Sequence, residues 1–207
     1  GTFVMPAIIM VIIQQTMLIG IGMIGGTWRE FGLYGKLCPA DRSRMSTLPI
    51  VAGKTLVYAS IYAVTTFYIL GLHYRLFHYP TNGSSLTIAA FMIPYLLACI
   101  TFGIAVSTLF RYRENSLLLL LWTSIPMLML SGISFPREAI PDWLYAFGQI
   151  FPSSHGVNAF IRIRSMGASF EEVLPEIRAL WMLVFVYGGL ACIGIHRVLR
   201  KAGCGKE

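Results

Sequence analysis

Two glycine patterns contain the residue types of nucleotide-binding loops. Gly20-x-Gly22-x-x-Gly25 has the letters of a dinucleotide fingerprint, and Gly53-Lys54-Thr55 has those that end a phosphate-binding loop. Both chemistries need the glycines between a strand and a helix, where backbone N–H groups can face phosphate oxygens. The first pattern instead lies inside an apolar stretch, and the second has Leu48 where its first glycine is required. The sequence therefore predicts close helix packing at the first pattern and no nucleotide-binding loop in this chain.

The segment Pro152-Ser153-Ser154-His155 contains the strongest candidate for a catalytic group. It differs by one letter from the Pro-Ser-Gly-His element of membrane lipid phosphatases, where a histidine attacks or protonates a phosphoester. That chemistry also needs a second histidine oriented by an aspartate, but only His196 follows His155, and no Asp follows Asp142. We therefore expect His155 to be an interfacial residue near a helix start. An intramembrane lipid-modifying enzyme that uses His155 remains a minor alternative.

The remaining histidines and the cysteines do not have the spacing of a metal site. His73 and His78 would lie about 140° apart on a helix, so they could not share a metal there. Cys38, Cys99, Cys192 and Cys204 form no C-x-x-C pair. We expect no catalytic residue, no cofactor and no metal in this chain.

Five apolar stretches with no charged residue or histidine in their interiors cover residues 3–26, 55–72, 86–109, 117–134 and 179–195. Each approaches the length of about 20 residues that a helix needs to cross a membrane. We predict a single all-α transmembrane domain over residues 1–207, a polytopic membrane helix bundle. A proton- or ion-coupled secondary transporter would need an ionisable residue inside the membrane, so that class stays an alternative without support in these spans.

The basic residues are distributed unevenly between the two sides of the predicted bundle. One side, formed by the 27–54 loop, the 110–116 loop and the C-terminal tail, holds 11 Lys and Arg residues, and the other holds five. The positive-inside rule makes the richer side cytoplasmic. The net charge of +7 then reports topology, and we expect no nucleic-acid partner. An odd number of spans with an outside N-terminus also predicts at least one upstream span.

The segment 135–152 follows the fourth span without a hydrophilic loop. It is too short and too rich in proline to cross the membrane, and too apolar for a solvated linker. We predict a re-entrant pair of short helices in the outer leaflet, because irregular backbone at that depth must be covered by protein or face a water-filled cavity. Pro141 suits the first turn of the second helix, and Trp143 can anchor it at the interface.

These motifs resemble the permease subunits of type-2 ABC exporters. The resemblance is carried by Ser131-Gly132-Ile133-Ser134-Phe135-Pro136, Ile140-Pro141-Asp142-Trp143 and Phe151-Pro152, and by the order of spans and loops. It implies that the re-entrant hairpin includes Phe135, Pro136, Pro141, Trp143, Phe151 and Pro152. It also implies an upstream span and an exoplasmic domain before Gly1, and a multi-pass protein of the bacterial inner membrane.

The 27–54 loop is a solvated basic loop by charge alone. The resemblance implies instead that it carries a coupling helix that docks on a separate ATPase, because Arg29-Glu30, Gly32, Pro39 and Gly53-Lys54 follow the family order. The residues expected at this site are Arg29, Glu30, Gly32, Lys36, Arg42 and Arg44.

By this resemblance the chain is half of an ATP-driven export pathway and is not itself an enzyme. Its implied partners are ABC ATPase subunits that hold ATP and Mg²⁺, a second permease copy in a homo- or heterodimer, and membrane lipid. Gln14 and Gln15 lie near the middle of the first span. They are candidates for a pathway lining or a dimer contact, with interhelical hydrogen bonding as the equal alternative.

Overall fold

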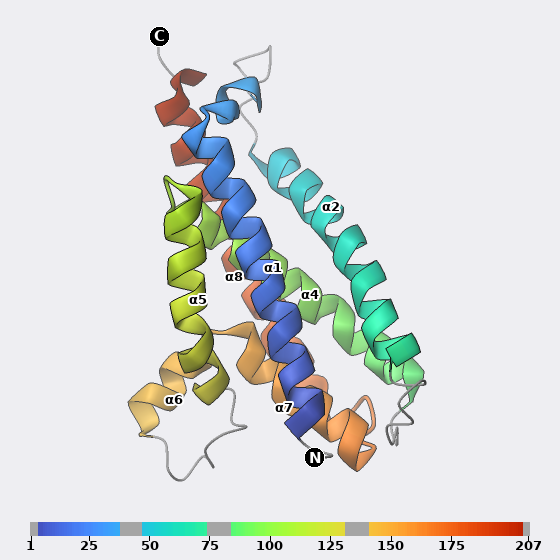
Figure 1. The fold of residues 1–207 in the computed structure, drawn as a ribbon. Helices are drawn as coiled ribbons and strands as arrows, with labels where there is room; N and C mark the ends of the chain where they lie inside the picture. The colour runs from blue at the N-terminus through green and yellow to red at the C-terminus, as the bar shows by residue number, and fades with distance from the viewer. Residues whose placement is uncertain (1–3, 38–46, 74–83, 131–140, 205–207) are drawn as a thin grey trace.

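The computed structural model describes residues 4–37, 47–73, 84–130 and 141–204, and every described element is helical. The helices are α1 (Val4–Glu30), α2 (Leu48–Phe67), α4 (Ser85–Ser107), α5 (Arg113–Leu130), α6 (Asp142–Gly148), α7 (Pro152–Met166) and α8 (Leu174–Leu199). Three short segments accompany them: η1 (Leu33–Leu37), η3 (Tyr68–His73) and η5 (Arg200–Cys204). The predicted all-α polytopic bundle is confirmed (Figure 1).

Four helical segments of the described chain are long and apolar enough to cross a membrane: Pro6–Glu30, Leu48–Gly71, Leu86–Ser107 and Leu174–Ala202. They correspond to four of the five predicted spans, with ends that differ by a few residues, and the last is longer at both ends than the predicted 179–195. The predicted span 117–134 begins on α5, whose 18 residues start with the polar Arg113-Glu114-Asn115-Ser116. With that polar turn included, the described part of α5 is not apolar enough over 18 residues to count as a membrane span. Residues 131–134 of the predicted span lie outside the described chain. The fifth span stays a prediction.

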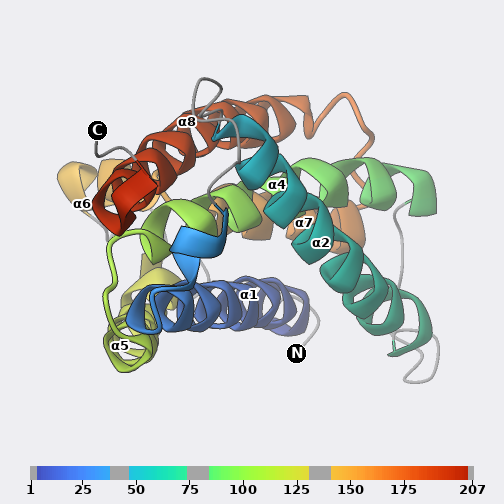
Figure 2. The same ribbon diagram turned by 90° about the horizontal axis from the view of Figure 1, so that it is seen from above.

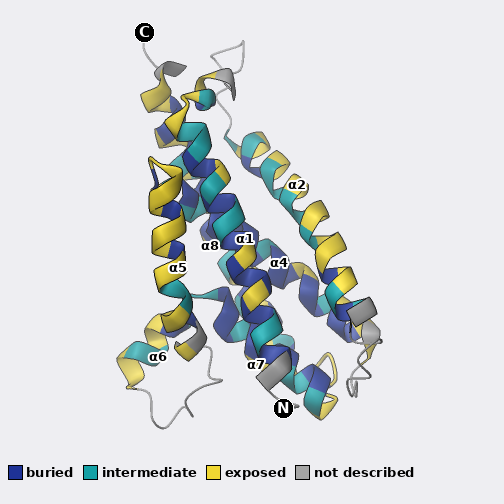
Figure 3. Cartoon of the chain, in the orientation of Figure 1, coloured by how far each residue is buried: buried dark blue, intermediate teal, exposed yellow. Residues whose placement is uncertain are grey.

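Helix α4 forms the centre of the bundle. It packs between α1 and α8, as Figure 2 shows in the view down the bundle. Along its most apolar stretch 72% of the residues are buried, whereas the corresponding share for α2 is 6%. Helix α2 therefore lies at the periphery, with exposed Leu56, Val64 and Phe67, and Figure 3 shows the difference in colour.

Tyr95 joins three helices in the bundle interior. Its ring is completely buried on α4, and its hydroxyl donates a hydrogen bond of 2.8 Å to the carbonyl oxygen of Met10 on α1. On its other side, a Cβ atom on Gly156 of α7 would lie 2.1 Å from the Tyr95 ring. Only a residue without a side chain lets α7 approach this closely, so Gly156 sets the distance between α7 and α4.

The short helices α6 and α7 lie at the end of the bundle that also holds the N-terminus (Figure 1). Pro141 immediately precedes α6, and Pro152 occupies the first turn of α7, where its missing N–H leaves no hydrogen bond unmade. Gly167 ends α7 in the left-handed conformation, with φ of 69°. Phe135 and Pro136 of the predicted hairpin lie outside the described residues, so the re-entrant arrangement stays a prediction.

We predict that Gly156→Ala destabilises the bundle, because the new methyl group would overlap the Tyr95 ring. Overpacking of this kind costs about 1–3 kcal/mol. The measurement is the thermal stability of the purified protein in detergent. Gly188→Ala on α8 is the matched control, since nothing lies within 4 Å of its Cβ position. Equal stability of the two variants would contradict the close α7–α4 contact.

Candidate functional site

Glycines let the backbone of α1 lie close against its neighbours. A Cβ on Gly22 would lie 2.3 Å from Ser116 Oγ of α5, and one on Gly25 would lie 2.6 Å from Ser107 Cβ of α4. A Cβ on Gly26 would lie 2.8 Å from the backbone of Arg113. The glycine pattern therefore serves helix packing, as predicted, and α1 is wedged between the end of α4 and the start of α5.

Arg29 ties the end of α1 to the connection between α4 and α5. Its Nη1 donates hydrogen bonds to the carbonyl oxygens of Thr108 at 2.8 Å and Phe110 at 3.2 Å. These carbonyls follow the last residue of α4, where a helix leaves backbone oxygens unpaired and its dipole attracts a cation. The sequence predicted Arg29 as a docking residue, and the structure gives it a bracing role inside the protomer that no local pattern indicated.

The two ends of the 27–54 loop meet at an aromatic pair. Gly32 turns the chain after α1 with a φ of 64°, and the backbone continues into η1. Tyr34 of η1 is buried and packs edge-on against Trp28, with 5.9 Å between ring centroids. The ammonium group of Lys54 on α2 lies 5.1 Å from the Trp28 ring centroid and 4.8 Å from that of Tyr34. This cation–π contact holds the exit of the loop against its entrance.

Trp28 and Tyr34 are functional candidates that the sequence reasoning missed. Their signal was present, since aromatic residues at the end of a span mark the membrane–water interface.

The other predicted coupling residues are placed only in part. Glu30 is exposed at the end of α1. The backbone of Lys36 belongs to η1, but its side chain lies outside the described structure, as do Arg42 and Arg44. The structure therefore brings Arg29, Glu30 and Gly32 together at one end of the bundle, and the docking role of the set stays a prediction.

Gln14 and Gln15 face the interior of the bundle. Their exposed fractions are 0% and 8%. The Nε2 atoms of both amides approach Met127 Sδ of α5, at 3.6 Å from Gln14 and 3.2 Å from Gln15, and the Cys99 thiol of α4 lies 3.6 Å from Gln14 Oε1. Gln15 Oε1 has no hydrogen-bond partner among the described residues. The pair thus makes interhelical contacts in one protomer, and its role in a pathway or dimer contact stays a prediction.

The opposite end of the bundle holds the described part of the predicted hairpin. Trp143 is largely exposed on α6. Phe151 packs edge-on against Phe102 of α4 and Phe147 of α6, with centroid distances of 6.0 and 5.5 Å. The Tyr187 hydroxyl of α8 donates to the carbonyl oxygen of Ile150. These contacts fix the turn between α6 and α7 to the core.

His155 lies in the first turns of α7, close to the predicted position. Its Nε2 is 3.1 Å from the carbonyl oxygen of Gln149. Burial lowers the pKa of His155, although the Gln149 bond and the negative charge of Glu176 oppose that shift. Glu176 itself pairs with Arg162 at 2.6 Å. No group of three or more His, Cys, Asp or Glu residues suited to a metal occurs in the described chain.

The described chain is thus a polytopic helix bundle whose first helix packs through glycines and whose basic connection is held at one end. Residues 1–193 match the family model described as ABC-2 family transporter protein. The chain belongs to this family and is an ABC transporter membrane subunit.

Relatives of known name support the assignment. The chain is 24% identical over 189 residues to the probable multidrug ABC transporter permease YbhR of Escherichia coli K12, covering 91% of the chain and 50% of the relative. It is 29% identical over 104 residues to the inner membrane transport permease YhhJ of the same organism, covering 50% and 28%. For ABC transporter G family member 20 of Dictyostelium discoideum the identity is 22% over 165 residues, covering 78% and 23%.

The chain thus spans half or less of the length of these relatives. No solved structure matched it. Family membership decides between the classes that the sequence left open, because it places the chain with ABC transporters rather than with ion-coupled transporters or lipid enzymes.

We predict that Arg29→Gln lowers the stability of the protein, because two carbonyls at the end of α4 lose a charged donor. A hydrogen bond to a charged group contributes about 1.5–3 kcal/mol, and partial exposure of Arg29 places the loss at the lower end. Glu30→Gln is the matched control, since Glu30 is the next residue along the chain and its side chain is exposed. Thermal unfolding in detergent checks both variants, and an unchanged midpoint for Arg29→Gln would contradict the bracing role.

Proposed function

We propose that this chain forms half of the translocation pathway of an ATP-driven export complex and docks a separate ATPase through its 27–54 loop. The observation that carries the proposal is the attachment of both loop ends to the bundle. Arg29 attaches the start of the loop to the α4–α5 connection, and Lys54 attaches the end of the loop to Trp28 and Tyr34. A load applied to the loop therefore reaches α1 directly.

Helix α1 is suited to pass such a load across the membrane. It runs from the loop to the opposite end of the bundle and packs against α4, α5 and α7 on the way (Figure 1). Close contacts of Gly22 with Ser116, Gly25 with Ser107 and Gly26 with the backbone of Arg113 leave little room for sliding against α4 and α5. We therefore propose that closure of the ATPases tilts α1, α4 and α5 of each protomer as one body, which moves the α6–α7 turn at the outer end.

The partners and location follow from the same proposal. A second permease copy completes the pathway, and ATP and Mg²⁺ are held by the ATPase subunits rather than by this chain. The side that carries Arg29, Arg111 and Lys201 faces the cytoplasm of a bacterial cell, because cytoplasmic loops are enriched in basic residues.

Docking predicts that Glu30→Lys weakens ATPase capture, since Glu30 is exposed next to the anchored Arg29. Reversal of a charge at an interface rim slows association and introduces repulsion. We expect about tenfold weaker binding, equivalent to about 1.4 kcal/mol. The assay is co-purification of the full-length permease with its ATPase and titration of the complex.

Glu114→Lys is the control for this assay, because Glu114 is an exposed carboxylate in the first turn of α5, at the same end of the bundle. Equal ATPase binding by wild type, Glu30→Lys and Glu114→Lys would refute docking at the start of the 27–54 loop.

The orientation predicts the labelling of two cysteines. Cys38 and Cys204 belong to the loop and the tail that we assign to the cytoplasm. A membrane-impermeant maleimide should leave both unmodified in sealed cells and should label both after permeabilisation. Cys99, which is buried, should stay unlabelled in both conditions. Modification of Cys38 or Cys204 in sealed cells would show that this side faces outward and would contradict the assigned orientation.

A further inference from the structure

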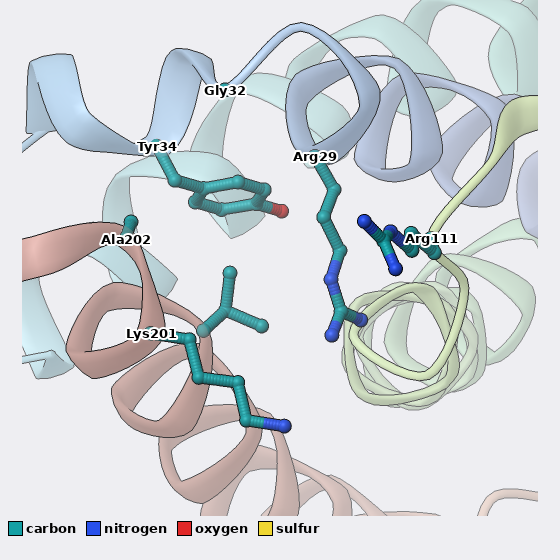
Figure 4. A pocket seen from close by; sticks show the side chains of 7 residues that line it. Arg29, Gly32, Tyr34, Arg111, Lys201 and Ala202 are labelled. Carbon is teal, nitrogen blue, oxygen red and sulfur yellow. The ribbon is translucent and has the colours of Figure 1, made fainter.

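A cavity of about 350 Å³ lies where the inner ends of three separate segments converge. It is lined by Arg29 in the last turn of α1, Gly32 after that helix, Tyr34 of η1, Arg111 before α5, Val198 at the end of α8, and Lys201 and Ala202 of η5. Figure 4 shows Arg29, Arg111 and Tyr34 directed into the space between the helix ends, with Lys201 along its edge. The volume is in the range of about 300–1,000 Å³ that is typical of small-molecule sites.

The lining carries three cations and, in the part of the chain that the structure describes, no carboxylate. Among the described residues, Arg29 bonds to Thr108 and Phe110 through Nη1 alone, so Nη2 and Nε are available there to another acceptor. Like charges around one cavity repel each other unless an anion lies between them. Arginine forks match the oxygens of a phosphate in particular, because they present paired N–H donors.

Tyr34 adds a neutral donor to these charges. Its ring is held between Trp28 and Lys54, which fixes the direction of the hydroxyl. Burial raises the pKa of Tyr34, although the charge of Arg29 opposes this shift. The hydroxyl therefore keeps its proton and can donate to an anion.

The cavity lies at the level where the spans end. Arg29 is in the last turn of the apolar segment Pro6–Glu30, and Val198, Lys201 and Ala202 belong to the end of the segment Leu174–Ala202. Trp28 and Tyr34 are aromatic residues of the kind that lie at headgroup depth. Val198 and Ala202 supply an apolar wall beside the cations, which suits a ligand that is both charged and attached to hydrocarbon.

We propose that this cavity binds the phosphate group of an anionic membrane lipid from the cytoplasmic leaflet. Basic pockets between the ends of membrane helices are general receptors for such headgroups. The bound phosphate bridges Arg29, Arg111 and Lys201 and thereby joins the ends of α1, the α4–α5 connection and α8. The site depends on the membrane orientation of the chain and not on ATPase docking.

The test uses the purified full-length permease in a neutral detergent, with phosphatidylglycerol or phosphatidylcholine added and the unfolding temperature measured. The pocket variant is Arg111→Gln/Lys201→Gln. The control variant Arg113→Gln/Arg200→Gln removes the same charge from neighbouring positions of the same segments, and neither residue lines the cavity. Arg29 is left intact because it braces the fold.

Phosphatidylglycerol should raise the unfolding temperature of wild type and control above the value in phosphatidylcholine. The pocket variant should need about tenfold more phosphatidylglycerol for the same shift, a change equivalent to about 1.4 kcal/mol. Equal lipid responses of the two variants would overturn the proposal. So would a full shift from soluble glycerol phosphate at the same concentration, since the ligand would then be a free phosphate.

A photoactivatable phosphatidylglycerol on the wild-type protein gives an independent readout that needs no variant. Crosslinks should map to peptides that contain residues 29–34, 108–112 or 198–202. Crosslinks confined to other peptides would refute the lipid site. A partner carboxylate is the occupant instead if the pocket variant loses ATPase binding while its response to phosphatidylglycerol stays that of wild type.

Discussion

The architecture depends on the close approach of α1 to α4 and α5. Inside a bilayer, helices gain nothing by hiding apolar surface from lipid, so packing between small residues has to hold them together. Gly22, Gly25 and Gly26 supply this contact, since a side chain at any of them would overlap Ser116, Ser107 or the backbone of Arg113. Each of these contacts lies in the half of α1 next to the basic loop, so α1 is held most tightly where a load from that loop would enter.

The same packing explains why charged and aromatic side chains lie together at that end of the bundle. With α1 seated against the end of α4, Arg29 reaches the carbonyls of Thr108 and Phe110. The turn at Gly32 then brings Tyr34 back toward α8, beside Lys201. One arrangement therefore serves two purposes, because it braces the loop that we assign to ATPase docking and it forms a cavity rich in positive charge. Occupation of that cavity by a lipid phosphate would strengthen the brace.

The sequence was sufficient for the fold class, for four helices long and apolar enough to cross a membrane and for the packing role of the glycine pattern. Apolar length and small-residue spacing are local properties, which the sequence shows directly. Contacts between segments far apart in the chain could not be predicted from the sequence. The bonds of Arg29 join positions about 80 residues apart in sequence, and the cavity draws on three segments whose proximity only the tertiary structure reveals. Gln14 and Gln15 show the same limit, since their spacing could not tell an interface with Met127 from a pathway lining. The fifth span and the hairpin stay predictions because residues 131–140 lie outside the described chain.

In the proposed mechanism, α1 and the α4–α5 connection move together when the ATPase acts. Spin labels at Ile24 on α1 and Glu114 on α5, both exposed and neither assigned to docking, report this motion in the assembled complex after replacement of the four native cysteines. Labelled protomers diluted with unlabelled ones give the distance between the two sites within a protomer, and a single label at Ile24 gives the distance between protomers. If the two segments move as one body, ATP changes the distance between protomers and leaves the distance within a protomer unaltered. A change within the protomer at a constant distance between protomers would contradict this mechanism.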